Sequence, residues 1–259
     1  MTAPGDDPRL TSLVRAGEQT AHISLDLADL TAGDTLRLEP GLERVLVMLS
    51  GEVRVVSGDG ALGVAGGRSD VFDGPADAVY LPPAAGASLV GGATGCRIAV
   101  AAADAGTLQP GEARIIPARA QTEAVAGRDL WQRLVRTILG PGDPASRLLV
   151  GETTHPIAGT WSSFPPHRHD RDAEDEVRLE EVYYYRVQPA EGFGVQVRYD
   201  TDSGVQEARM VRDGDAAAIT AGFHPVAAAP GYRLYYLWIM AGEGRAVRPF
   251  IDPRYRWLT

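Results

Sequence analysis

Short apolar segments rich in valine, tyrosine and leucine recur along the chain, separated by glycine, proline and aspartate. β-Branched and aromatic residues favour strands, and the residues between the segments favour turns. We therefore predict a chain built almost entirely of strands. The predicted strands are residues 35–40, 44–51, 52–58, 78–83 and 97–103 in the first half, and 147–154, 181–188, 193–200, 216–220 and 233–241 in the second.

One segment has the spacing of a helix. Leu130, Leu134 and Ile138 follow one another at intervals of four residues, which places them on one helical face. A Gly-Pro-Gly sequence comes directly after them and is a strong helix terminator. We therefore predict a helix over residues 128–139.

The two halves of the chain resemble each other weakly. Residues 42–47 parallel residues 179–184, and in each half a later aspartate-rich turn leads into a strand and then a Pro/Gly corner. A duplicated all-β unit explains this economically. We place the boundary within residues 115–127 and expect one domain at 1–118 and another at 119–259.

The charge and composition exclude several classes of function. All 25 basic residues are arginine, the chain has no lysine and no asparagine, and 34 acidic residues give a net charge of −9. No lysine imine, pyridoxal phosphate anchor or phosphate-loop lysine is available, and the acidic balance argues against a nucleic-acid partner. Carbonyl chemistry would therefore need a metal, an acid/base pair, or both.

Cysteine usage and hydropathy predict an ordinary soluble protein. Cys96 is the single cysteine, so no disulfide within the chain is possible. The sequence has no apolar run of about 18 residues, and its start lacks the basic and apolar regions of a signal peptide. We expect a cytoplasmic protein without a membrane partner.

The histidines indicate a metal site in the second half. His167 and His169 are separated by one residue, so on a strand both point to the same face. Glu181 at the start of a predicted strand and His224 at a distant Gly-x-His corner complete a possible set of four ligands. Three imidazoles and one carboxylate suit Zn²⁺, Mn²⁺, Fe²⁺ or Ni²⁺. The pair alone is weak, because two neighbouring histidines can also be surface or core residues.

The order of these motifs resembles the cupin superfamily. Longer strings, among them THPIAGTWSSFPPHRHD, LEEVYYYRV, GFHPVAAAPGYRLYYLWIMAG and GGRSDVFDGPADAVYLP, resemble the 5-deoxy-glucuronate isomerase family of myo-inositol catabolism over nearly the whole chain. The resemblance implies an all-β bicupin with two double-stranded β-helix (jelly-roll) barrels and little helix. It implies that only the second barrel binds a divalent metal, through His167, His169, Glu181 and His224.

The resemblance also implies the reaction, an aldose–ketose isomerisation of 5-deoxy-D-glucuronate to 2-deoxy-5-keto-D-gluconate. Eleven residues separate His169 from Glu181, more than in the common cupin pattern, which leaves Glu176 and Glu180 as rival ligands. We prefer Glu181, because strand alternation then directs it inward together with Tyr183 and Tyr185.

Several neighbours are candidates for catalysis or substrate binding. Tyr183, Tyr185 and Tyr236 could move or position protons, although buried tyrosines more often serve packing, and Glu180 is a possible base. Gln196 could bind a substrate hydroxyl. The sequence does not rank the arginines that could bind a substrate carboxylate. These are Arg186, Arg198, Arg233 and Arg245.

One residue leaves the exact substrate undecided. Trp238 stands where the family often has asparagine, on the same strand face as Tyr236. The alternatives are a ketol-isomerase for a related hexuronate, a metal cupin dioxygenase, and a sugar-acid-binding cupin without catalysis. In each case we expect a small uronate or sugar acid as ligand, and a homo-oligomer.

Overall fold

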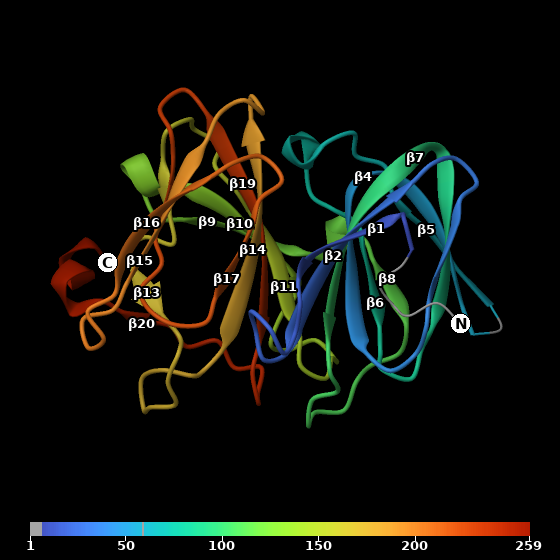
Figure 1. The fold of residues 1–259 in the computed structure, drawn as a ribbon, viewed down its shortest axis with the longest axis horizontal. Coiled ribbons are helices and arrows are strands. Elements are labelled where there is room, and N and C mark those ends of the chain that lie inside the picture. The colour runs from blue at the N-terminus through green and yellow to red at the C-terminus, as the bar shows by residue number, and fades with distance from the viewer. Residues whose placement is uncertain (1–6, 59) are drawn as a thin grey trace. The chain divides into compact units, whose positions relative to one another are not determined.

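The computed structural model describes residues 7–58 and 60–259, in which nearly all regular structure is β-strand (Figure 1). The all-β class predicted from the sequence is confirmed. No helix within these residues has the length and apolar character needed to cross a bilayer. The first six residues, part of the start considered for a signal peptide, lie outside the described residues.

The chain forms two compact units. Unit 1 comprises Met1–Gln121 and Ile138–Leu149, and unit 2 comprises Thr122–Thr137 and Val150–Thr259. Segment 138–149 belongs to unit 1, although residues 122–137 before it belong to unit 2. A single domain boundary does not reproduce this division. The domains 1–118 and 119–259 therefore stay a prediction.

The strands of unit 1 form an eight-stranded sheet. Its order is β1-β2-β7-β4-β6-β8, with β3 paired to β7 and β5 paired to β4. The strands are β1 (Leu10–Val14), β2 (Ile23–Leu30), β3 (Thr35–Leu38), β4 (Glu43–Ser57), β5 (Gly60–Gly66), β6 (Ala78–Leu81), β7 (Ala87–Ala103) and β8 (Arg114–Ile116). Short 3-10 helices lie at η1 (Val71–Asp73) and η2 (Ala118–Ala120).

The strands β9 to β20 form three sheets, with orders β17-β14-β19-β11-β10-β9, β12-β18-β15-β16 and β13-β20. The strands are β9 (Thr122–Ala126), β10 (Arg133–Leu139), β11 (Leu149–Thr154), β12 (Trp161–Ser162), β13 (His167–Arg168), β14 (Glu180–Gln188), β15 (Gly194–Tyr199), β16 (Gln206–Val211), β17 (Ala216–Ile219), β18 (Val226–Ala228), β19 (Arg233–Ala241) and β20 (Phe250–Ile251). Two 3-10 helices, η3 (Asp129–Trp131) and η4 (Pro253–Leu258), accompany them.

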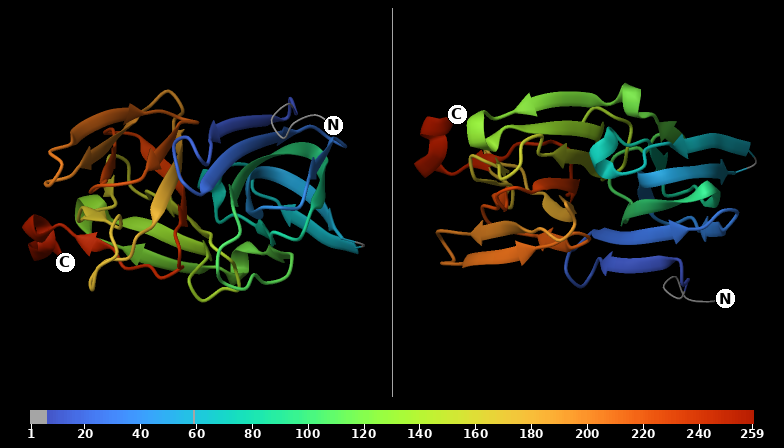
Figure 2. Two further views of the ribbon diagram at one scale, coloured as in Figure 1. Left: turned by 60° about the horizontal axis from the view of Figure 1, so that its bottom comes forward. Right: turned by 90° about the horizontal axis from the view of Figure 1, so that it is seen from above.

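The helix predicted over residues 128–139 is wrong. Only the short η3 forms there, and residues 133–139 are strand β10, antiparallel to β9 (Figure 2). A spacing of four residues fits a strand as well as a helix, because four is a multiple of the two-residue repeat of a strand. The β-branched residues Val135, Thr137 and Ile138 then favour the strand.

The two units repeat the same strand pairing. β4 pairs with β7 from Glu43 opposite Ala103, and β14 pairs with β19 from Glu180 opposite Ala241. β4 also pairs with β6, and β14 pairs with β17 in the matching register. The positions of β14 from Glu180 to Tyr185 therefore have counterparts in β4 from Glu43 to Met48, which supports the internal duplication suggested by the sequence.

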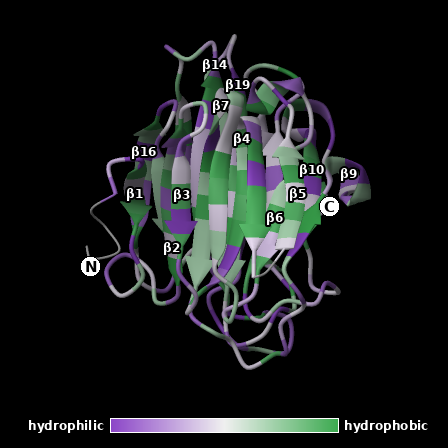
Figure 3. Ribbon diagram, turned by 90° about the vertical axis from the view of Figure 1, so that its right-hand side faces the viewer, coloured by the Kyte–Doolittle hydropathy of each residue, from purple (hydrophilic) through white to green (hydrophobic). Residues whose placement is uncertain are grey.

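The corresponding inner faces of the two units differ in chemistry. On β4 and β7 the inner face packs into an aliphatic cluster that includes Leu46, Met48 and Ile98. On β14 and β19 the counterparts of these three residues are tyrosines, and they pack into the inner cluster of unit 2. Figure 3 shows hydrophobic and hydrophilic positions interspersed along β3 and β4, as expected for strands with one face in a core.

A buried carboxylate fixes one connection within unit 1. Glu43 is fully buried, and its oxygens accept hydrogen bonds from the backbone N–H groups of Ser146, Arg147 and Leu148. The hydroxyl of Tyr80 donates a fourth, at 2.8 Å. Charge-assisted hydrogen bonds of this kind compensate the carboxylate for the loss of water, so Glu43 anchors segment 146–148 to strand β4.

We expect Glu43→Gln to destabilise the protein by about 2–4 kcal/mol, because the amide NH₂ would face backbone N–H groups and leave buried donors unsatisfied. Urea unfolding measures the effect as a lower midpoint. The matched control is Glu39→Gln, at an exposed position nearby. Equal midpoints for the two variants would contradict the anchoring role.

Candidate metal centre

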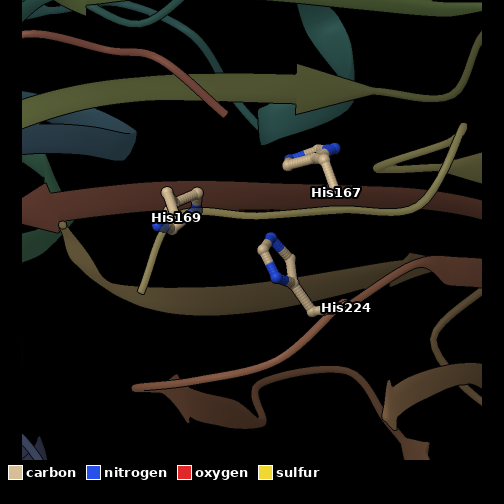
Figure 4. Close-up of side chains that lie close together, drawn as sticks. All are labelled: His167, His169 and His224. Carbon is tan, nitrogen blue, oxygen red and sulfur yellow. The ribbon is translucent and has the colours of Figure 1, made fainter. Parts of the chain in front are cut away.

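Three imidazoles from two distant segments meet inside unit 2. His167 and His169 lie at the β13 segment, and His224 lies on the loop before β18. One ring nitrogen of each lies within 4.8 Å of those of the others, and the three rings turn toward a common space (Figure 4). His169 and His224 are buried, and His167 is partly buried.

Backbone carbonyls orient all three rings. Nδ1 of His169 donates to the Leu179 carbonyl at 2.8 Å, and Nδ1 of His224 donates to the Gly222 carbonyl at 2.9 Å. Nδ1 of His167 has a longer contact, 3.4 Å, with the Pro165 carbonyl. A carbonyl can only accept, so the proton of a neutral ring lies on Nδ1 and the lone pair on Nε2. This is the arrangement that metal-ligating histidines typically adopt.

The carboxylate of Glu181 lies next to the imidazoles. One of its carboxylate oxygens, Oε2, lies 3.2 Å from Nε2 of His169 and 3.3 Å from Nε2 of His224. Glu181 is 4% exposed, and it follows from strand alternation that Glu181, Tyr183 and Tyr185 share the inner face of β14. Glu181 therefore lies beside two of the three imidazoles, His169 and His224.

The electrostatics of the centre keep Glu181 ionised and His167 neutral. Burial disfavours the ionised Glu181, but the neighbouring imidazoles of His169 and His224 outweigh it and lower the pKa of Glu181 to about 2. Burial and the neighbouring imidazoles lower the pKa of His167 to about 3. For His169, burial opposes protonation, yet the bond to Glu181 prevails and raises its pKa.

The residues present fit a divalent metal ion. Nε2 of His224 is buried and makes no hydrogen bond within the described residues, which is costly for a polar atom without a ligand. Three imidazole lone pairs and one carboxylate form the donor set of mononuclear sites that bind Zn²⁺, Mn²⁺, Fe²⁺ or Ni²⁺.

Unit 1 has a different residue at the matching position. Glu181 lies opposite Ile219, and its counterpart Arg44 lies opposite Leu81 in the same register. The Arg44 side chain donates to the carbonyls of Glu39 and Leu42. A guanidinium is a permanent cation without a lone pair for a metal, so this position in unit 1 offers no ligand.

The acid-rich loop between His169 and Glu181 is an organised support. Glu176, a rival ligand in the sequence, is buried, and its carboxylate accepts from the Arg168 side chain and from the N–H groups of Asp170 and Arg171. The Asp170 carboxylate in turn accepts from the N–H of Gly222 at 2.6 Å. Asp170 therefore ties the HxH segment to the loop whose carbonyl orients His224.

Tyrosines and serines line the wall beside the imidazoles. The Tyr183 hydroxyl lies 2.9 Å from the Ser163 hydroxyl, and the Tyr236 hydroxyl lies 2.6 Å from that of Ser162. The Tyr183 ring lies 6.2 Å from that of His224, centroid to centroid. The sequence does not single out these two serines, because a serine pair at the end of a short strand has no distinguishing pattern.

Two other predicted residues have different surroundings. The Tyr185 hydroxyl donates to Oε1 of Gln196 at 2.5 Å, and the two N–H groups of the Gln196 amide lie within hydrogen-bond distance of three backbone carbonyls. Gln196 thus has its hydrogen bonds satisfied by the protein. Glu180 lies on the opposite face of β14 from Glu181, so strand alternation directs it away from the imidazoles.

Trp238 lies on the inner face with Tyr236, as parity predicts. Its ring lies directly over Gly151 of β11, where an added Cβ would be 2.0 Å from the indole. Gly151 thus provides the space that the indole occupies.

The four candidate arginines have other partners or a buried position. Arg186 pairs with Asp213 at 2.7 Å, and Arg198 pairs with Glu207 at 3.0 Å. Arg233 donates to Gln188, and Arg245 is buried. The geometry does not select one of them as a carboxylate ligand.

Comparison with known proteins gives the family. The KduI/IolB family profile matches residues 4–258. The chain belongs to this family. A 5-deoxy-glucuronate isomerase of Geobacillus kaustophilus is 34% identical over 259 residues, with 99% of this chain and 92% of the relative covered. The 5-deoxy-glucuronate isomerase of Bacillus subtilis strain 168 is 29% identical, with 92% and 88% covered.

Solved structures agree with the family assignment. An IolB-like protein from Salmonella typhimurium LT2 superposes with a TM-score of 0.90 at 32% identity, covering 96% of this chain and 94% of that one. The oxalate decarboxylase of Lactobacillus farciminis superposes with a TM-score of 0.66 at 9% identity, covering 95% and 84%. The latter is evidence for the fold alone, and the predicted all-β bicupin is confirmed.

We expect Gly151→Ala to destabilise the protein by about 1–3 kcal/mol, because the new methyl group overlaps the Trp238 indole. Thermal unfolding would give a lower midpoint, and tryptophan fluorescence would change as the indole moves. Gly142→Ala is the matched control, since nothing lies within 4 Å of its added Cβ. An unchanged midpoint and spectrum for Gly151→Ala would contradict the packing described.

Proposed function

We propose that this protein is a metal-dependent aldose–ketose isomerase that converts 5-deoxy-D-glucuronate into 2-deoxy-5-keto-D-gluconate. The observation that carries the proposal is the convergence of three imidazoles and Glu181 in a chain similar over its whole length to 5-deoxy-glucuronate isomerases. The absence of lysine agrees with it, because an imine route is closed to this chain.

His167, His169, Glu181 and His224 would hold the metal, and the carbonyls behind their Nδ1 atoms would keep the rings in place. A divalent ion supplies Lewis-acid stabilisation of the negative charge that develops on substrate oxygens during enolisation. Arg44 at the matching position of unit 1 supports a single metal centre, in unit 2.

Tyr183 is suited to donate a hydrogen bond to a substrate oxygen. Burial, reinforced by the charge of Glu181, raises the pKa of Tyr183 well above its usual value, and burial likewise raises that of Tyr185. Both phenols therefore keep their protons at neutral pH and act as donors rather than bases. Tyr185 already donates to Gln196, so we assign the donor role to Tyr183, with Tyr236 beside it.

Turnover of 5-deoxy-D-glucuronate tests the proposal directly. We expect NMR to show loss of the aldehyde and appearance of the ketone, loss of turnover after chelation, and recovery with one of Zn²⁺, Mn²⁺, Fe²⁺ or Ni²⁺. Oxygen uptake in place of isomerisation would favour a dioxygenase. A protein that isomerises no uronate with any of these metals would contradict the proposal.

We expect His224→Ala to weaken metal binding by more than about a hundredfold, since loss of a group that merely orients a metal ligand costs about 10- to 100-fold. Metal analysis after dialysis and a competition titration measure the effect, and circular dichroism checks that the strands remain. His22→Ala, in unit 1, is the matched control and should keep its metal. Full metal occupancy in His224→Ala would refute the ligand set.

A further inference from the structure

The inner wall of unit 2 carries polar groups that this fold does not require. Tyr183, Tyr185 and Tyr236 occupy the ladder positions that Leu46, Met48 and Ile98 hold in unit 1. Unit 1 therefore forms the same pairing with aliphatic side chains. Burying hydroxyl and imidazole groups is costly unless each finds a partner, so their presence on one wall indicates a polar ligand.

The serine and tyrosine hydroxyls of this wall have more O–H donors than their mutual hydrogen bonds use. Tyr183 pairs with Ser163, and Tyr236 pairs with Ser162, so two hydrogen bonds use two of four O–H protons. A third contact, 3.5 Å between Ser163 and Tyr236, would use one more. At least one O–H remains available to donate to a ligand.

The backbone conformation of Ser163 indicates that the position of its side chain is functionally required. Its φ is 49°, in the left-handed region that residues other than glycine seldom adopt, although the side chain is buried. Strained backbone of this kind tends to occur where a side chain must be held for function. The strain here places the Ser163 hydroxyl beside that of Tyr183.

His155 adds an acceptor farther along the same wall. Its ring lies 6.4 Å from that of Tyr236 and nearly perpendicular to it, and the side chain is fully buried. The Thr160 hydroxyl donates to the Ile157 carbonyl, so it can only accept from Nδ1 of His155. The lone pair is then on Nε2, which has no hydrogen-bond partner within the described residues.

Burial, with the nearby Arg133 charge, lowers the pKa of His155 to about 4, so the ring is neutral at physiological pH. The wall thus presents a spare donor near the imidazole cluster and a spare acceptor beyond it. A hydroxyl group both donates and accepts. A carbon chain with several hydroxyls therefore matches the wall, whereas a hydrocarbon chain would leave these groups unsatisfied.

We propose that Ser162, Ser163, Tyr183, Tyr236 and His155 form a subsite for the hydroxyl-bearing carbon chain of a sugar acid whose reacting end lies at the metal centre. The inference rests on the proposed function, and it assigns substrate-binding roles to Ser162, Ser163 and His155. In this arrangement Nε2 of His155 accepts a hydrogen bond from a substrate hydroxyl.

Two non-isomerisable ligands test the subsite in the zinc-loaded protein. Gluconate and 2-hydroxyhexanoate share a carboxylate, an α-hydroxyl and six carbons, but only gluconate carries hydroxyls on the remaining carbons. Calorimetric titration gives the ratio of their dissociation constants. We expect wild type to bind gluconate at least tenfold more tightly. Each of His155→Phe and Ser162→Ala should lower that preference by about five- to twentyfold, the usual effect of one buried hydrogen bond.

Two further variants separate binding from folding. His155→Gln places an amide oxygen near the position of Nε2 and should restore much of the preference, which a purely structural role would not require. Tyr235→Phe removes a buried hydroxyl that donates to Glu152 from the opposite face of β19, so it should leave the ratio unchanged. Thermal unfolding and metal analysis accompany each titration.

An unchanged ratio in both His155→Phe and Ser162→Ala, or no preference in wild type, would overturn the subsite. Isomerisation of 5-deoxy-D-glucuronate by the same wild-type preparation would then leave the proposed function standing. The opposite result, a preference that these variants lose in a protein without isomerase activity, would support the subsite and refute the proposed function.

Discussion

A hydrogen bond from Nδ1 to a backbone carbonyl sets the direction of each imidazole in the centre, and the chemistry depends on this constraint. Leu179 and Gly222 supply the carbonyls for His169 and His224. Because a carbonyl accepts only, the lone pairs remain on Nε2 and point at the same place as the Glu181 carboxylate. If these rings rotated freely, their Nε2 atoms would no longer point to a common place, even with all four residues present.

The loop between His169 and Glu181 makes that constraint possible. Glu176 gathers the Arg168 side chain and two backbone N–H groups, and Asp170 binds the N–H of Gly222. Gly222 is the residue whose carbonyl orients His224. A run of acids that would pass for a solvated surface loop is thus part of the support of the site.

Because the chain contains a duplicated unit, residues of unit 2 can be compared with their counterparts in unit 1. The first six residues of β4 and of β14 pair in the same register, so a residue there in β14 can be compared with its counterpart in β4. Arg44 corresponds to Glu181, and Leu46 and Met48 correspond to tyrosines. The same framework therefore accommodates an aliphatic interior in one unit and a polar wall in the other. Backbone pairing fixes where side chains lie, and their identity decides the chemistry.

The sequence by itself determined the strand-rich class and the weak repeat, because these follow from local composition and two-residue alternation. It predicted the four residues of the centre from the spacing of the histidines together with the family resemblance, with Glu176 and Glu180 as rivals of Glu181. It failed at residues 128–139, where a four-residue spacing fits both a strand and a helix.

Only the tertiary structure decided which partners each side chain has. It directed Glu180 away from the imidazoles, engaged Glu176 with Arg168, and brought Ser162 and Ser163 to the tyrosine hydroxyls. These outcomes depend on hydrogen bonds between residues far apart in the chain, which no local pattern records. The free lone pair on Nε2 of His155 is also a feature that only the tertiary structure decided, because it depends on the groups that surround the ring.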